Sequence, residues 1–192
     1  ALDGENRYHA VFAKGHKCVL VNPSTLAPAL IALGATAEVL GPKGKRTLEL
    51  ARFFRAPSSA KEREHVLAPN EMVISVTLEM KGLKNASYEV RHKQSYDWPL
   101  VQAAVAFKLD GDKASGVKVV LGHVAPTPLE SSAAAKALEG KAITEESAGA
   151  AGEAAAEGAT PLSQNAYKVK LIAVAVKRAI LIAAGKKRYW EA

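Results

Sequence analysis

The sequence predicts an α+β protein in which antiparallel strands lie in the middle of the chain and helices follow. Apolar side chains alternate with small or polar ones through residues 101–108, which is the two-residue period of a half-covered strand. The Asp-Gly-Asp turn at 110–112 reverses the chain, and residues 117–121 supply β-branched side chains for the returning strand. Because an isolated hairpin is marginal in water, we expect the helical segments between residues 131 and 184 to cover its apolar face.

In the first half of the chain, short apolar runs separated by turn residues predict small elements. Residues 22–25 begin a helix, since a Ser or Thr hydroxyl can accept hydrogen bonds from the free amides of the first turn. Leu26, Leu30 and Leu33 share one face of that helix, which Gly34 ends. The predicted strands are 18–21, 36–40, 45–50 and 72–78, with a turn at 41–44, a short helical piece near 53–54 and an exposed loop over 55–68.

The second half begins with a long strand predicted over residues 88–98, ahead of the hairpin. Residues 131–138 are predicted to form a helix, and an alanine-rich helix spans 144–157, where acidic residues in the first turn favour the positive end of the helix dipole. The strongest helix prediction covers 165–184, and we expect this helix to lie on the sheet. The residues at helical spacing on its expected inner face are Leu171, Val174, Arg178, Leu181 and Ile182.

Composition narrows the class of protein. With 192 residues, of which 48% are hydrophobic and 23% charged, the sequence is typical of a soluble, folded protein of one large or two small domains. No apolar run approaches the roughly 20 residues that span a bilayer. The net charge of +7 is scattered except at residues 186–188, without alternating basic and aromatic residues, so we do not expect nucleic acid as a partner.

The single cysteine excludes some kinds of site, and the N-terminus bears on how the chain begins. Cys18 alone excludes an internal disulfide and a metal site built from several thiolates, and we expect it to be buried in the strand 18–21. Ala1 is not an initiator methionine, and no signal-like apolar stretch follows it, so we expect a processed start, a cut or a domain boundary. The N-terminus does not report the compartment; we expect a cytoplasmic location and keep the periplasm as the alternative.

A search for catalytic motifs leaves few candidates. The sequence contains no HExxH, GxSxG, GxxxxGK[ST], CxxC or GxGxxG pattern, and we assign neither a catalytic residue nor a metal site. Ser95, Tyr96 and Asp97 follow the predicted long strand, where such residues suit a ligand contact or a turn equally well. Residues 7–9, Arg-Tyr-His, suit either a polar anchor or a loop packed against a neighbour.

Six stretches that occur in order along the chain carry a resemblance to a known family. Together they resemble the FAD-binding subunit of molybdenum hydroxylases, the group of xanthine dehydrogenase, aldehyde oxidoreductase and carbon monoxide dehydrogenase. RYHA and SQNAYK are most similar to the bacterial aldehyde oxidoreductase type. The stretches are residues 4–12, 21–35, 69–78, 90–107, 119–128 and 161–180.

The resemblance implies a fold and a set of partners. Residues 1–83 would be the latter part of a PCMH-type FAD-binding domain, and residues 84–192 the flavoprotein C-terminal domain, a three-stranded antiparallel sheet covered by helices. The chain would pass electrons from iron-sulfur clusters through FAD to an acceptor, within a hetero-oligomer that also holds an iron-sulfur subunit and a molybdopterin subunit. The alternative is a non-catalytic docking module that holds those subunits together.

The resemblance also implies cofactor contacts. Thr25 stands where the family usually has Asp, and Glu89 stands where many members have Lys, so both contacts are altered. The glycine-rich loops that hold the FAD diphosphate precede the family position matching Ala1, so we expect FAD to be shared with an N-terminal part of the flavoprotein and to bind weakly without it. The implied FAD contacts are Ser24, Thr25, Val73, Ile74, Glu89, Tyr96 and Asp97.

Overall fold

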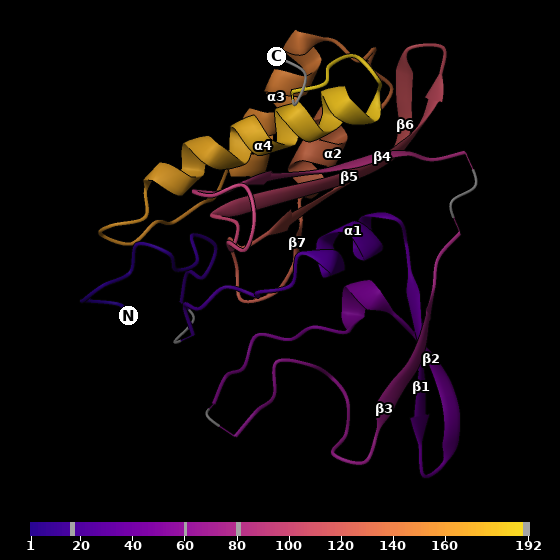
Figure 1. The fold of residues 1–192 in the computed structure, drawn as a ribbon, viewed down its shortest axis with the longest axis vertical. Helices are drawn as coiled ribbons and strands as arrows, with labels where there is room; N and C mark the ends of the chain where they lie inside the picture. The colour runs from indigo at the N-terminus through magenta and orange to yellow at the C-terminus, as the bar shows by residue number, and fades with distance from the viewer. Residues whose placement is uncertain (16–17, 60, 80–81, 190–192) are drawn as a thin grey trace.

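The computed structural model of the protein describes residues 1–15, 18–59, 61–79 and 82–189. Its helices and strands confirm the predicted α+β class (Figure 1). The helices are α1 (Leu26–Ala32), α2 (Ser132–Leu138), α3 (Glu145–Ala156) and α4 (Tyr167–Ala183), with a short 3-10 turn, η1, at Leu50–Arg52. The strands are β1 (Thr36–Gly41), β2 (Gly44–Glu49), β3 (Met72–Thr77), β4 (Lys84–Val90), β5 (Val101–Asp110), β6 (Lys113–Gly122) and β7 (Leu129–Glu130).

The strands form two antiparallel sheets, with the orders β2-β1-β3 and β4-β5-β6-β7. The predicted three strands of the second sheet are present, and a fourth that we did not predict, β7, pairs with β6 over two residues at the edge. In Figure 1 the larger sheet lies between the helices α2, α3 and α4 on one side and α1 on the other. The smaller sheet lies on the far side of α1.

The β5–β6 hairpin forms as predicted. Asp110 pairs with Lys113 across the turn, and Gly111 adopts a φ of 60°, which glycine reaches without steric cost. Val105 and Phe107, which share a face by alternation, are at most 1% exposed and belong to the hydrophobic cluster on the helix side of the sheet. The hairpin therefore carries the core of the protein.

The prediction that β5 is covered on one face only was wrong. Ala104 and Ala106 are each 1% exposed and belong to a second cluster, with Ile31 and Ala32 of α1 and Val120 of β6. Their small side chains leave room for α1 to lie directly on the sheet. The strand is buried on both faces until Lys108, beyond which the hairpin reaches solvent.

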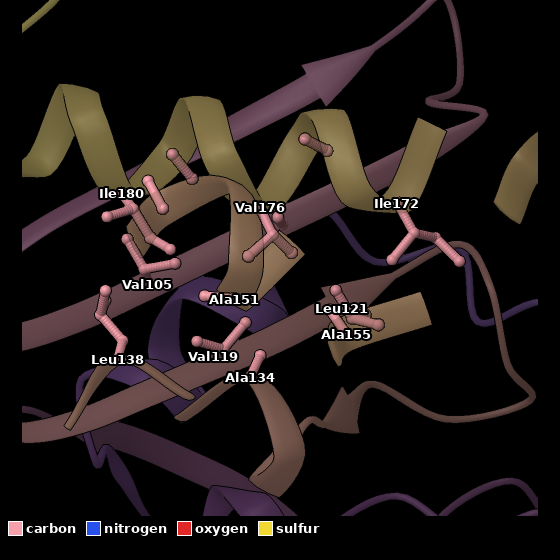
Figure 2. Close-up of a cluster of buried hydrophobic side chains, with 14 of the residues drawn as sticks. Val105, Val119, Leu121, Ala134, Leu138, Ala151, Ala155, Ile172, Val176 and Ile180 are labelled. Atoms are coloured by element: carbon pink, nitrogen blue, oxygen red, sulfur yellow. The ribbon is translucent and has the colours of Figure 1, made fainter. Parts of the chain in front are cut away.

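The helical layer packs closely on the sheet (Figure 2). Val105 and Val119 of the hairpin meet Leu138 of α2 and Val176 of α4 in one buried cluster. The α3 and α4 backbones touch at Gly152, where an added Cβ would lie 2.3 Å from the main-chain oxygen of Ala173. Small residues on α3 make this close approach possible.

Side-chain caps by Ser131 and Thr144 confirm the predicted starts of α2 and α3. The buried face of α4 agrees with the prediction only at Leu181. Ile172, Val176 and Ile180 are fully buried (Figure 2). Val174, which we placed on the inner face, is 40% exposed. Arg178 lies partly buried at the edge, where its guanidinium donates to the Tyr88 hydroxyl. The buried face of α4 is rotated relative to the predicted one, because alanines make much of the contact between this helix and the sheet.

Three local predictions in the rest of the chain were wrong. Residues 18–21 do not form a strand; only Val19 accepts a backbone hydrogen bond there, from Ala10 N, and Cys18 is half-buried. The helix α1 buries Ala27 and Ile31, while Leu26 is 65% exposed. The predicted long strand over 88–98 is instead β4, which starts at Lys84 and ends at Val90.

The N-terminal segment, residues 2–11, is fixed to the start of α4 by buried amides. Asn6 and Asn165 are each fully buried. The Asn6 side chain donates to Ser163 Oγ at 3.0 Å and accepts from Gln164 N at 2.9 Å. The Asn165 side chain donates to the main-chain oxygens of His9 and Ala10 at 3.1 and 3.2 Å. This network brings the first and last thirds of the chain together.

Candidate ligand-binding site

A pocket of about 470 Å³ opens where the N-terminal segment, the β4–β5 connection and the first turn of α4 meet. Its volume lies in the range of pockets that hold small organic ligands. Tyr8, His92 and Trp98 give it aromatic walls, and Trp98 remains 66% exposed. The lining residues are Tyr8, Val21, His92, Asp97, Trp98, Pro99, Leu100 and Lys168.

The β4–β5 connection, residues 91–98, is closed by Asp97. One carboxylate oxygen of Asp97 accepts hydrogen bonds from His92 N at 3.1 Å and from Lys93 N at 3.0 Å. These bonds, led by that from Lys93, lower the pKa of Asp97. Tyr96 has a φ of 53°, which is rare outside glycine, and its side chain is fully exposed. The loop thus presents the Tyr96 side chain to solvent, while the hydrogen bonds of Asp97 hold the two ends of the loop together.

We expect Asp97→Asn to open this loop. The amide oxygen that replaces the carboxylate accepts the two N–H groups more weakly, so hydrogen exchange of the His92 and Lys93 amides should rise by roughly tenfold. In the unchanged protein the closure should hold at neutral pH and weaken only as the pH falls through the lowered pKa of Asp97. Ser95→Ala, an exposed change in the same loop, is the control, and equal exchange in both variants would contradict the assignment.

Lys168 places a cation at the pocket. It is 1% exposed, and its Nζ donates to the main-chain oxygens of Tyr8 at 2.8 Å and His123 at 2.9 Å. Burial lowers the pKa of Lys168 to about 8. The His123 ring is also 1% exposed, and neither ring nitrogen has a hydrogen-bond partner in the described structure. Burial and the nearby Lys168 lower the pKa of His123 to about 4, so this ring is neutral near pH 7.

The structure brings only some of the predicted cofactor residues together. Of the seven, Asp97 lines the pocket and Tyr96 is in the same loop. Thr25 and Glu89 lie near each other through Gln102, whose side chain donates to Thr25 O at 2.7 Å and whose backbone pairs with Glu89. These two groups form no common pocket among the described residues.

The remaining predicted residues lie elsewhere. The Ser24 hydroxyl accepts from Ala27 N at 3.0 Å and so makes the capping bond that we expected of a Ser or Thr hydroxyl there, while Thr25 makes no capping hydrogen bond. Val73 and Ile74 are on β3 of the smaller sheet; Val73 packs against the second cluster, and Ile74 is 37% exposed. Whether these residues contact FAD stays a prediction.

Sequence reasoning did not connect the aromatic and cationic side chains of the pocket with a ligand site; these are Tyr8, His92, Trp98 and Lys168. Trp98 could have been found, because it is adjacent to Asp97 in a predicted connection. Lys168 is four residues before the buried Ile172, so it falls on the inner stripe of α4, but a lysine is ordinarily placed on the solvent face. Tyr8 joins the pocket only through the packing of the N-terminal segment.

Two further findings concern the described ranges as a whole. None of their helices combines the length and apolarity that a membrane crossing needs. Within the same ranges, no group of three or more His, Cys, Asp and Glu side chains could hold a metal ion.

The fold and the sequence agree with one protein family. Residues 86–183, about half of the chain, match the CO dehydrogenase flavoprotein C-terminal domain. The chain belongs to this family. The flavoprotein C-terminal domain therefore includes the larger sheet and the three helices that cover it, and one wall of the pocket, residues 92–100, lies within the match.

Similar proteins extend over most of the chain. The aldehyde oxidoreductase FAD-binding subunit PaoB of Escherichia coli (strain K12) is 34% identical over 173 residues, which is 89% of this chain and 51% of the relative. The carbon monoxide dehydrogenase medium chain of Hydrogenophaga pseudoflava is 31% identical over 165 residues, covering 83% of this chain and 56% of the relative. The chain spans about half the length of these curated relatives.

Solved structures show the same arrangement. Carbon monoxide dehydrogenase from Hydrogenophaga pseudoflava superposes with a TM-score of 0.71 at 31% identity, over 84% of this chain and 56% of the other. Quinoline 2-oxidoreductase from Pseudomonas putida 86 has a TM-score of 0.72 at 23% identity, over 92% of this chain and 60% of the other. At that lower identity the second likeness concerns the fold alone.

Proposed function

We propose that this chain is part of the FAD-binding electron-transfer subunit of a molybdenum-containing hydroxylase, of the aldehyde oxidoreductase or xanthine dehydrogenase type. Membership of the flavoprotein family carries the proposal, and the similarity to an aldehyde oxidoreductase FAD-binding subunit supports it. The oxidised substrate would be bound in a molybdopterin subunit. A separate iron-sulfur subunit would supply the electrons.

The pocket residues fit the ring system of a flavin. Tyr8, His92 and Trp98 offer aromatic surfaces, and the buried Lys168 ammonium places a positive charge at the wall of the pocket. Bound FAD would supply the redox chemistry by accepting electrons and passing them to an acceptor. This chain would hold and orient the ring, exclude water from one side of it and place a positive charge beside it.

An N-terminal companion would supply the rest of the cofactor site. The edge strand β3 is suited to contact it, because Met72, Ile74 and Val76 are between 37 and 59% exposed. The opposite edge, β2, carries Lys45, Arg46 and Glu49, and charged residues protect an edge from pairing. The curated relatives are about twice as long as this chain. We therefore propose that β3 is the strand that contacts the N-terminal part of the flavoprotein.

The proposal is tested on the natural assembly, purified through a tag on this chain. We expect visible flavin absorbance, released FAD in about equimolar amount, and molybdenum and iron that co-purify. An assembly that contains the partner subunits but no flavin would contradict the proposal. A cytoplasmic location also stays a prediction, which cell fractionation tests.

The second candidate function is a non-catalytic docking module for the iron-sulfur and molybdenum subunits. The exposed apolar residues of β3 favour it, and so does the net charge of +7, which suits an acidic partner surface. Flavin removal separates the two functions. If the chain is only a docking module, removing the flavin should leave the partner subunits bound and electron flow unchanged. If it is an electron-transfer subunit, electron flow to the acceptor should be lost.

A further inference from the structure

Lys168 is a buried cation held only by main-chain oxygens. Its Nζ donates to Tyr8 O at 2.8 Å and to His123 O at 2.9 Å, and the side chain is 1% exposed. An ammonium has three N–H donors, so one N–H has no partner within the described residues. Because Lys168 lines the pocket and is buried, its positive charge would act on a ligand there with little screening by water.

No carboxylate in the described ranges neutralises Lys168. Asp97, the acid that lines the same pocket, uses one oxygen for the amides of His92 and Lys93 in its own loop. Carbonyl dipoles compensate a buried charge only in part, and an unpaired buried charge is costly. Such a charge is retained at functional sites, where a ligand of opposite charge completes the pair.

The other titratable or charged groups around Lys168 leave this positive charge in place near pH 7. His123 is neutral there, because its pKa is lowered to about 4, and Tyr167 is also neutral, because its pKa is raised. The groups on the surrounding segments are Arg7 and Tyr8, His92 and Asp97, His123, and Tyr167.

We propose that Lys168 is the residue of this chain that stabilises the reduced, anionic form of the bound flavin ring. This inference rests on the proposed function. Flavin bound there would take up two electrons, supplied by the iron-sulfur clusters, and one proton, and its reduced ring would then carry one negative charge. A cation beside the ring lowers the free energy of that anion relative to the neutral ring, and so raises the reduction potential.

The test is the midpoint potential of flavin in the assembled complex, measured by spectroelectrochemistry against pH. Lys168→Met should disfavour the reduced flavin about tenfold, which is roughly 30 mV for a two-electron couple. Lys168→Arg should match the unchanged protein near pH 7, because the guanidinium stays charged. Lys170→Met is the control, since Lys170 is exposed two residues later on the same helix.

The pH dependence separates a charge effect from a packing effect. Lys168 has a pKa of about 8, and a neighbouring anion would raise it, so the difference between Lys168→Met and the unchanged protein should be full well below pH 8 and should decrease as the pH rises above it. A Lys168→Met complex that keeps both its flavin and an unchanged potential overturns the proposal.

If Lys168→Met loses flavin or fails to fold, the comparison with Lys168→Arg decides. The flavin potential of the Lys168→Arg complex should rise above that of the unchanged protein as the pH passes about 8, because only the lysine loses its charge there. Superposable curves overturn the inference and leave the proposed function intact. A wild-type complex without flavin overturns both, and is recognised before any variant is made.

Discussion

Replacing Gly152 by alanine is expected to lower the free energy of unfolding by about 3 kcal/mol. The new Cβ would lie 2.3 Å from the main-chain oxygen of Ala173 and 3.1 Å from its carbonyl carbon. Backbone atoms cannot rotate away as a side chain does, so α3 and α4 would have to separate and loosen the core shown in Figure 2. Urea unfolding followed by far-UV circular dichroism measures the loss.

Gly149→Ala, on the same helix, is the matched control. An added Cβ there meets nothing within 4 Å, and alanine is favoured over glycine inside a helix by about 1 kcal/mol. We therefore expect Gly149→Ala to stabilise the protein slightly. The close helix contact would be refuted if Gly152→Ala also unfolded at an unchanged or higher urea concentration.

Asn165→Asp is expected to release the N-terminal segment from α4, at a cost of roughly 3 kcal/mol. The amide nitrogen of Asn165 donates to His9 O and Ala10 O, and its oxygen accepts from Leu162 N at 2.7 Å. A carboxylate would turn an acceptor toward the two carbonyls and bury a charge that has no partner. Faster hydrogen exchange in residues 6–11 and new tryptic cleavage after Arg7 measure the release.

Gln164→Glu makes the same chemical change one residue earlier, where the side chain is exposed and makes only a weak 3.5 Å contact with Gly4 O. It should leave exchange in residues 6–11 unchanged. If both variants behaved alike, the effect would come from net charge rather than from the buried amide.

The centre of the fold could be predicted because its signals are local. The alternation over residues 101–108 and the turn at 110–112 are enough to specify the hairpin. The second burial of β5 could not be predicted, because Ala104 and Ala106 are small enough for either solvent or a packed helix, and only the position of α1 decides. The same ambiguity of alanine rotated the expected face of α4.

The β4–β5 connection shows a second reason why a structure cannot be predicted from local sequence signals alone. Tyr88 and Val90 have strand propensity, so the prediction extended the strand beyond them, whereas Asp97 folds the chain back onto the amides of His92 and Lys93. Asp97 was singled out both from its place after the predicted strand and by resemblance, and the structure places it in the pocket. Lys168 gave no local signal, since its burial depends on carbonyls 160 and 45 residues away in the chain.

The position of α1 on the larger sheet bears on how the gene can be divided. The predicted domain boundary at 83/84 stays a prediction, but a break there would leave Ala104, Ala106 and Val120 without the helix that covers them. Each of two separately translated halves would expose a hydrophobic surface, and the halves would have to associate before either aggregated. Fusions, splits and tag insertions are therefore better placed upstream of Asn6 or at the exposed residues 58–59.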